Sequence, residues 1–327
     1  MHDKSRRTAA KSGAVICLGL TPAVQRTMSF ARFQAGEVNR ACRVEVSVGG
    51  KAVNTGLALA RLRRACVVTG LNGGGTGRDI AAHLAAHGVT CAFTRTTWPT
   101  RICTTILDRA SGTATELVEE ARPPTPVLLG RFEARSRALL RGAGAAVICG
   151  TLPCGVPEDF WARLSAEARR RHVPLVIDSH GPPLLRALRG EPLLAKMNVR
   201  ELEQTFAVAC RSRTQIVAGA RRLVAAGAQW ALVTHGAAPA MLVSRTGEVW
   251  QVSPPAIGNV SNPIGSGDCV NAGVVHALLH GDAMPDAVRF GLGCGSANAL
   301  TPNPAEFSPG TARRLAKACR VLAACRI

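Results

Sequence analysis

A glycine-rich segment late in the chain, IGSGD at residues 264–268, has the composition of a turn that binds an anion. Apolar residues follow it at helical spacing and predict a helix over residues 269–279, which Gly281 ends. The first N–H groups of a helix lack partners within the helix and carry partial positive charge, and flanking glycines let an anion approach closely. The segment is therefore a candidate phosphate site. The alternative is a tight turn before a buried helix.

Asp268 adds a proton acceptor to this segment. The helix dipole favours a carboxylate in the first turn, so Asp268 could simply stabilise the helix start. Beside amides that bind phosphate, it is also placed to take a proton from an attacking hydroxyl. The two roles together describe phosphoryl transfer. The segment is not a Walker A loop, because no Lys-Ser/Thr follows the second glycine, and it lacks the third glycine of the dinucleotide fingerprint.

A second glycine-rich segment, GGK at residues 49–51, precedes a predicted helix over residues 52–62. Lys51 would stand at the positive end of that helix, where a cation is unfavourable unless an anion binds beside it. The alternative is an exposed lysine at a helix start. Ligands of an open parallel sheet bind at the carboxyl ends of its strands, and both glycine-rich segments belong to that edge in the predicted fold.

Short apolar runs without alternation predict strands buried on both faces of a parallel sheet. They lie at residues 14–20, 66–71, 145–150, 174–179 and 231–236. Segments with helical spacing lie between them, and the one at residues 157–170 opens with proline and acidic residues, as helix starts do. This alternation predicts a doubly wound α/β domain over residues 13–327.

Two regions depart from this pattern, at residues 24–48 and 91–119. Their residues alternate between apolar and polar, with turns such as Ala110-Ser111-Gly112, which predicts half-buried antiparallel strands. We expect a small β-sheet that projects from the main sheet. It either covers a site or extends the sheet edge.

The net charge of +19 fits three classes of partner: nucleic acid, an anionic membrane surface or phosphorylated small molecules. Aromatic residues make up only 4% of the chain and tyrosine is absent, so bases would find few stacking partners. No apolar run reaches membrane-spanning length. We therefore expect neither specific nucleic-acid binding nor a membrane partner, and assign most of the charge to arginines on solvated helix faces.

The twelve cysteines are scattered through apolar segments and form no CxxC pair, which indicates a reduced, cytoplasmic protein. Residues 1–12 are interpreted as a disordered basic leader rather than a secretory signal, because the apolar run that follows is short and breaks at Thr21-Pro22.

Two segments resemble the signatures of one enzyme family. NPIGSGDCVNAG (262–273) resembles the C-terminal signature of the PfkB, or ribokinase-like, sugar kinases. VGGKAVNTGLALARL (48–62) resembles their N-terminal signature, most closely in the 1-phosphofructokinase and tagatose-6-phosphate kinase branch. Shorter motifs in the family's order extend the resemblance over nearly the whole chain: TPAVQRT (21–27), PTRICTTI (99–106), GTLPCGVP (150–157), AKMNVRELE (195–203) and VTHGAAPAMLV (233–243).

The resemblance implies a ribokinase-like fold and an ATP- and Mg²⁺-dependent kinase. Asp268 would be the base for the sugar hydroxyl, and the amides of Gly265, Ser266 and Gly267 would form the anion hole. The residues implied for the sugar phosphate are Gln25, Gly49, Gly50, Lys51, Asn54, Arg101 and Glu119. Those implied for the nucleotide are Lys196, Thr234, Gly236 and Asn298, the last of them facing the adenine pocket.

The resemblance also implies that Asn198 and Glu201 organise Mg²⁺ through bound water, although residues of these types could merely cap a helix. The β-elements at 24–48 and 91–119 would form a lid over the substrate and could join two copies into a homodimer. His235 is interpreted as incidental, because the branch varies at that position.

The chain departs from the branch at its sugar end. Gln25 stands where the branch has aspartate, and Thr105 stands where it commonly has lysine; Pro263 and Val118 are further differences. We expect a kinase of a sugar phosphate of the fructose-1-phosphate or tagatose-6-phosphate type. The alternatives are a kinase of an unphosphorylated sugar or a nucleoside, and a ligand-binding homologue without activity.

Overall fold

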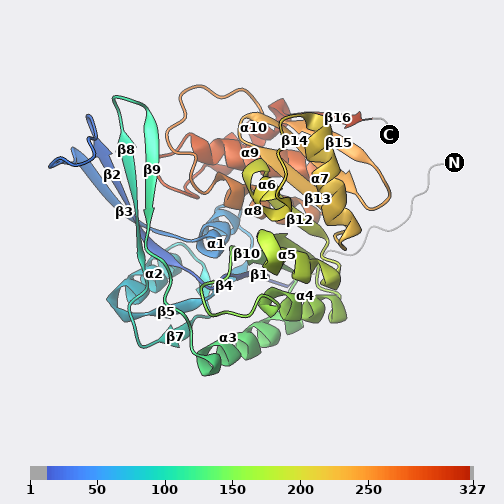
Figure 1. Ribbon diagram of the computed structural model, residues 1–327, viewed down its shortest axis with the longest axis horizontal. Coiled ribbons are helices and arrows are strands. Elements are labelled where there is room, and N and C mark those ends of the chain that lie inside the picture. Colours follow the sequence, from blue (N-terminus) through green and yellow to red (C-terminus); the bar gives the residue numbers. More distant parts are fainter. Residues whose placement is uncertain (1–12, 325–327) are drawn as a thin grey trace.

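The apolar runs predicted as strands form the centre of a ten-stranded sheet (Figure 1). The structure is a computed structural model that describes residues 13–324. The leader predicted at residues 1–12 lies outside the described residues. Neighbouring strands run parallel in the order β6-β4-β1-β10-β11-β12-β13. They are β1 (Val15–Leu18), β4 (Cys66–Thr69), β6 (Thr90–Cys91), β10 (Ala145–Cys149), β11 (Leu175–Asp178), β12 (Leu194–Asn198) and β13 (Trp230–His235).

Three antiparallel strands extend the sheet beyond β13, in the order β14-β15-β16. They are β14 (Ala238–Ser244), β15 (Val249–Ser253) and β16 (Arg320–Ala324). The mostly parallel, doubly wound sheet that the sequence predicts is therefore confirmed.

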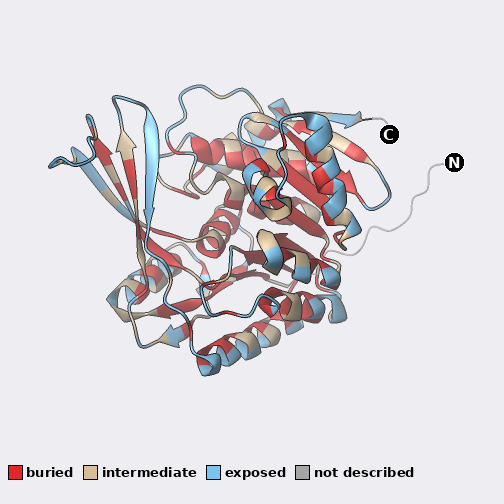
Figure 2. Ribbon diagram, in the orientation of Figure 1, coloured by how far each residue is buried: buried red, intermediate tan, exposed pale blue. Residues whose placement is uncertain are grey.

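Helices cover both faces of this sheet because its central strands are apolar on both sides (Figure 2). In β1, Val15 and Cys17 pack into one core cluster, and Ile16 and Leu18 pack into the other. Full burial of one such side chain contributes roughly 1.5–3 kcal/mol, which is why these runs show no alternation.

The two core clusters assign the helices to the two faces. One face holds α1 (Lys51–Arg61), α2 (Gly74–Ala86), α8 (Ser266–Leu278), α9 (Met284–Ala299) and α10 (Pro309–Ala318). The other holds α3 (Pro126–Leu139), α4 (Phe160–Arg170), α5 (Gly181–Ala187), α6 (Val199–Phe206) and α7 (Arg213–Ala225), with short 3₁₀ turns at Leu140–Gly142 and Leu188–Gly190.

A separate four-stranded sheet stands beside the main domain, at the left of Figure 1. Its order is β3-β2-β8-β9, and β2 and β8 run parallel. Its strands are β2 (Ala23–Phe30), β3 (Arg43–Gly49), β8 (Ile102–Asp108) and β9 (Thr113–Val118). We call it the small sheet. These strands lie largely within the two regions predicted as β-structure, but the pairing of β2 with β8 is parallel, whereas antiparallel strands were predicted.

The first part of the predicted 91–119 region lies elsewhere. Cys91 ends β6 at the edge of the large sheet, and β7 (Thr94–Thr96) pairs with β5 (Leu71–Gly73) in a two-stranded sheet. These strands are only two or three residues long. Their alternation is the same in either sheet, so the sequence pattern does not tell the pairings apart.

The two faces of the small sheet differ in chemistry. Its inner face carries Gln25, Thr27 and Thr105, which are all at most 6% exposed. Its outer face carries Val44 and Val46, which are 51% and 64% exposed. The inner face therefore covers these polar side chains, whereas the outer face exposes Val44 and Val46 but buries Val24, Val48 and Ile106.

Candidate active site

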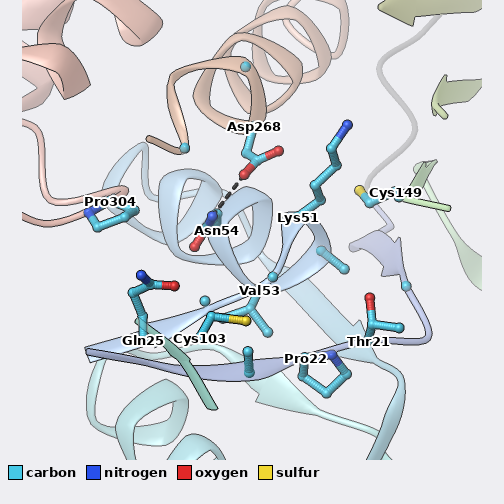
Figure 3. A pocket seen from close by; sticks show the side chains of 18 of the residues that line it. Thr21, Pro22, Gln25, Lys51, Val53, Asn54, Cys103, Cys149, Asp268 and Pro304 are labelled. Atoms are coloured by element: carbon cyan, nitrogen blue, oxygen red, sulfur yellow. Dashed lines mark hydrogen bonds between the residues drawn. The ribbon is translucent and has the colours of Figure 1, made fainter. Parts of the chain in front are cut away.

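A cavity of about 480 Å³ opens where the small sheet faces the carboxyl edge of the large sheet (Figure 3). Its walls come from strand ends of the large sheet, from the first turns of α1 and α8, and from the inner face of the small sheet. Most of the residues predicted for the site line this cavity: Gln25, Gly49, Gly50, Lys51, Asn54, Arg101, Lys196, Asn198, Glu201, Gly265, Gly267 and Asp268.

Asp268 lies in the first turn of α8, is 6% exposed, and faces the cavity. Its Oδ2 accepts a 2.8 Å hydrogen bond from Asn54 Nδ2 (Figure 3). Asn54 projects from α1 and is itself buried. The contact fixes the orientation of the Asp268 carboxylate, so that its other oxygen, Oδ1, stays available to a ligand.

The backbone at the start of α8 leaves amides without partners. Gly265 adopts a left-handed conformation, with φ 78°, and caps the helix. Among the described residues the amides of Gly265, Gly267 and Asp268 have no acceptor, as expected at a helix N-terminus. The predicted anion hole differs in one member, because the Ser266 amide already donates to the Pro263 carbonyl at 3.2 Å.

The centre of charge in the site is Asp178, which the sequence analysis did not single out. It ends β11 and is fully buried. Its Oδ1 lies 2.6 Å from Lys51 Nζ, and its Oδ2 lies 2.6 Å from Lys196 Nζ and 2.6 Å from Asn271 Nδ2. One sign was available in the sequence: an aspartate that closes an apolar strand stands at the ligand-binding edge of a parallel sheet.

The two lysines connect Asp178 to the rest of the cavity. Lys51 Nζ also lies 3.0 Å from Glu201 Oε1, so this ammonium group bridges two carboxylates. Lys196 approaches the start of α8 so closely that a Cβ at Gly267 would lie 2.7 Å from its Nζ. A side chain at position 267 would therefore push the ammonium group away from the free amides.

The charges in this network shift the pKa values of its members. Burial, and then the charge of Asp178, raise the pKa of Asp268 to about 7. Burial alone would raise the pKa of Asp178, but Lys196 and Lys51 hold it well below its usual range. Burial opposes the charge on Lys51 as well, yet Asp178 and Glu201 hold the pKa of Lys51 above its usual range. Asp178 and Lys51 are therefore both charged at neutral pH, whereas Asp268 titrates near neutrality.

Asn198 and Glu201 form a capping box at the start of α6. The Asn198 side chain accepts from the Glu201 amide at 2.9 Å, and Glu201 Oε2 accepts from the Asn198 amide at 2.9 Å. Both also line the cavity. Within residues 13–324 no cluster of three or more His, Cys, Asp or Glu side chains is arranged to hold a metal. A metal here would therefore need water or ligand oxygens as well.

The part of the cavity beneath the small sheet holds Gln25 and Arg101. Gln25 Nε2 donates to Thr105 Oγ1 at 2.7 Å, so the two main departures from the branch pattern contact each other. The Arg101 guanidinium donates to the backbone carbonyls of Glu119 and Thr21 at 2.9 and 3.3 Å. The Glu119 carboxylate accepts from the backbone amide of Ile102, and Glu119 lies outside this cavity, in the wall of an adjoining one of about 290 Å³.

Three of the predicted nucleotide residues lie beyond the cavity. Thr234 pairs with Asn198 across β12 and β13, which brings it to the same edge of the sheet, and Gly236 follows in an open turn. Asn298 is fully buried: its amide nitrogen donates to Ile264 O and Ser266 Oγ, and its oxygen accepts from the amide of Ala305. The predicted contact of Asn298 with adenine finds no support in this geometry, because its polar atoms are already bonded.

Other features of the described chain bear on the broader expectations. The cysteines within residues 13–324 are all free thiols. None of the helices in this range has the length and apolarity needed to cross a bilayer. His235 is exposed and outside the cavity.

Known proteins share the sequence pattern and the fold of this chain. The sequence pattern of the pfkB family carbohydrate kinases matches residues 14–310. A 1-phosphofructokinase from Borreliella burgdorferi is 30% identical over 295 residues, which cover 90% of this chain and 94% of that protein. A 1-phosphofructokinase from Rhodobacter capsulatus is 32% identical over 277 residues, which cover 84% and 87% of the two chains.

Solved structures show the same fold. A possible 1-phosphofructokinase from Thermotoga maritima superposes with a TM-score of 0.86 at 24% identity, over 95% of this chain and 99% of that one. An Arabidopsis thaliana ribokinase complexed with ribose and ATP superposes with a TM-score of 0.74 at 17% identity, over 93% and 99%. The ribokinase-like fold with a separate small sheet is therefore shared with these structures.

Proposed function

Because the chain belongs to the pfkB family of carbohydrate kinases, we propose that it transfers the γ-phosphoryl group of ATP to a hydroxyl of a sugar phosphate. The acceptor is of the fructose-1-phosphate or tagatose-6-phosphate type. The identity of about 30% to two 1-phosphofructokinases supports this acceptor class. The observation that carries the proposal is the buried Asp268 carboxylate, aligned by Asn54 at the end of a helix whose first amides are free.

Asp268 acts as the general base in this reaction. Its pKa of about 7 lets it stay ionised near neutral pH and still accept a proton readily. The acceptor hydroxyl binds Oδ1, because Oδ2 is held by Asn54. The proton moves to Asp268 as the sugar oxygen attacks phosphorus, and ADP leaves on the opposite side.

The start of α8 and Lys196 stabilise the charge on the migrating group. The free amides of Gly265, Gly267 and Asp268 point to an anion site at the positive end of the helix, and the Lys196 ammonium lies beside it. Fixed donors in a buried site contribute more to such stabilisation than solvent does. The Ser266 amide takes no part in this role.

The residues at the end of β12 fit a magnesium ion that is held mainly by water and phosphate oxygens. Mg²⁺ usually keeps several waters and takes one or two carboxylates from the protein. Glu201 offers a carboxylate that faces the cavity, and Asn198 holds it in place through the capping box. When bound there, the ion would neutralise charge on the nucleotide phosphates. Thr234 and Gly236, at the same edge of the sheet, would contact the nucleotide.

The acceptor occupies the cavity between Asp268 and the small sheet. Gly49 and Gly50 border it at the start of α1, and Gln25 faces it from β2. Arg101 would bind the acceptor phosphate, because within residues 13–324 its guanidinium bonds only backbone carbonyls. Lys51 is bound to Asp178 and Glu201, so we assign it to the charge network rather than to a direct phosphate contact.

The small sheet also serves as a lid and, we propose, as a dimer contact. Its outer face exposes Val44, Val46 and Leu117, with exposed fractions of 51%, 64% and 53%. In the register Val46 lies in one row with Arg26, Thr104 and Leu117. An exposed apolar face on a projecting sheet is a typical interaction surface. Its occupant here would be a second copy of the chain.

Release of ADP across a panel of acceptors tests the kinase function. The panel holds fructose 1-phosphate, tagatose 6-phosphate, the matching free sugars and nucleosides. We expect a sugar phosphate to stimulate ADP release. Stimulation by nucleosides alone would contradict the acceptor class, and no stimulation by any member would favour a ligand-binding homologue without activity.

A further inference from the structure

The cavity that would receive two phosphate-bearing substrates has no excess of positive charge, although the chain has a net charge of +19. As many carboxylates as cations line it: Glu116, Glu201 and Asp268 against Lys51, Arg101 and Lys196. Both lysines are already paired with Asp178, which lies behind the wall. Of the cations in this wall, Arg101 alone has no carboxylate partner within the described chain.

Gln25 and Thr105 form a neutral pair at the sugar end of the same cavity. They are 80 residues apart in the sequence, and the parallel pairing of β2 with β8 brings them within 2.7 Å. Because Thr105 holds the amide nitrogen of Gln25, the amide oxygen is turned away from Thr105. This Oε1 lies over Gly49, where an added Cβ would be 3.4 Å away. The cavity wall therefore presents a hydrogen-bond acceptor at this point.

The side chains around this pair are uncharged or acidic. In the register Ser47 and Cys103 lie opposite Gln25, and Glu116 lies opposite Thr105. Glu116, Gln25 and Cys103 all line the cavity. A phosphate dianion beside Glu116 would meet like charge, whereas a sugar hydroxyl could donate to Gln25 Oε1.

We propose that this end of the cavity recognises an uncharged, hydroxyl-bearing part of the acceptor. Gln25 Oε1 accepts the hydroxyl, and Thr105 is a positioning residue that fixes the Gln25 amide. An acceptor phosphate is bound by Arg101 alone. In consequence the protein discriminates only weakly between a sugar phosphate and the free sugar, and free hexoses belong to its acceptor range. This inference rests on the proposed kinase function and narrows its substrate class.

Calorimetric titration tests the inference through binding rather than turnover. The full chain, saturated with a non-hydrolysable ATP analogue and Mg²⁺, is titrated with fructose 1-phosphate and with fructose. The measured quantity is the ratio of the two dissociation constants. Tagatose 6-phosphate and tagatose form a second pair. Three variants of Thr105 are compared. Thr105→Lys introduces the cation that the branch commonly has at this position. Thr105→Val removes the acceptor for Gln25 Nε2 at nearly constant shape, and Thr105→Ser keeps that acceptor.

We expect wild type to favour the phosphorylated sugar by no more than about a hundredfold, the effect of a single charge-assisted contact. Thr105→Lys should raise the ratio at least about tenfold by tightening the phosphorylated ligand. Thr105→Val should weaken both ligands about equally, by roughly five- to thirtyfold, and Thr105→Ser should restore them.

Three results would overturn the proposal: a wild-type ratio above about a hundred, equal affinities of Thr105→Val and wild type, or no binding of either sugar. Thr105 is fully buried, so Thr105→Lys risks misfolding. If that variant does not fold, the affinities of Thr105→Val and Thr105→Ser decide whether the proposal stands. ADP release with the same ligands reports on the kinase function separately. A weak preference in binding without ADP release would remove the kinase proposal and keep the recognition proposal.

Discussion

The carboxylate of Asp178 lies 2.6 Å from the ammonium groups of both Lys51 and Lys196. This buried anion holds two cations that come from α1 and β12 at one point between the predicted nucleotide and sugar sites. Its charge also contributes to the raised pKa of Asp268. The proposed base Asp268 and Lys196 therefore both depend on a residue that is fully buried behind the cavity wall.

Removal of this charge is expected to destabilise the protein. Asp178→Asn keeps the shape of the side chain but leaves the two ammonium groups with one carboxylate at ion-pair distance among the described residues, Glu201, which contacts Lys51 only. Breaking a buried pair in this way costs about 3–5 kcal/mol. Urea unfolding measures the loss. Glu158→Gln, which breaks the exposed pair with Arg186, is the matched control and should cost less than about 1 kcal/mol. Equal effects of the two substitutions would contradict the role assigned to Asp178.

Replacement of the base should remove turnover while the fold is kept. Asp268→Asn retains a partner for Asn54 but cannot take a proton from the acceptor, so kcat should fall by about 10²–10⁴-fold. ADP release under saturating substrates measures the change. Asp286→Asn is the control, since Asp286 also stands in the first turn of a helix, α9, but is exposed. A kcat within about tenfold of wild type would rule out Asp268 as the general base.

The pH dependence of activity follows from the same carboxylate. The base must be ionised, and the pKa of Asp268 is about 7. Below that pH the active fraction falls about tenfold for each unit, and above it the fraction is constant. We therefore expect kcat/KM to rise up to a pH near 7 and then to level. Rate measurements between about pH 5.5 and 8.5 check this, and a flat profile over that range would contradict it.

Stability should respond to pH in the opposite direction. The Asp268 carboxyl has a pKa of about 7 in the folded chain and a pKa near about 4 when unfolded. The folded state therefore binds the proton more tightly, and this contribution is complete below about pH 4 and lost as the pH rises to 7. Asp268→Asn cannot ionise, so it should melt above wild type at pH 8. At pH 4, where both side chains are neutral, the two melting temperatures should agree.

The outer face of the small sheet should control assembly. Val46→Lys replaces one of the exposed apolar side chains of this face with a charged one, which would be buried against a second copy, and should convert a dimer to a monomer. Light scattering after size exclusion gives the mass of each form. Val127→Lys is the control, because Val127 is 66% exposed but belongs to α3, which is not part of the small sheet. A monomeric wild type would contradict the proposal that this face is a dimer contact.

Much of the fold and part of the site were predictable from local patterns. The parallel strands were predictable because a continuous apolar run is recognisable without knowing which strands pair. The start of α8 was predictable because Gly265 and Asp268 lie within four residues of each other. Asp178 was missed because its partners Lys51, Asn271 and Lys196 are 127, 93 and 18 residues away, so none of them stands in the same sequence segment.

The Gln25–Thr105 contact is a second feature that the sequence alone did not predict. Each residue was recognisable as a departure from the branch pattern, yet only the parallel alignment of β2 with β8 shows that the two departures form one hydrogen bond. The assignment of Asn298 to the adenine pocket rested on the resemblance alone. The structure shows that the Asn298 side-chain amide nitrogen donates instead to the Ile264 carbonyl and to Ser266 Oγ.

The chain passes directly from β3 of the small sheet into α1 of the main domain. Gly49 ends the small-sheet strand, Gly50 turns the chain with φ 101°, and Lys51 begins the helix. A Cβ at Gly50 would lie 2.8 Å from the Thr21 carbonyl, so the turn is packed against the start of β2 and cannot hinge freely. We therefore expect the small sheet and the first turn of α1 to move as one unit, so that any displacement of the sheet would also displace the Lys51 ammonium.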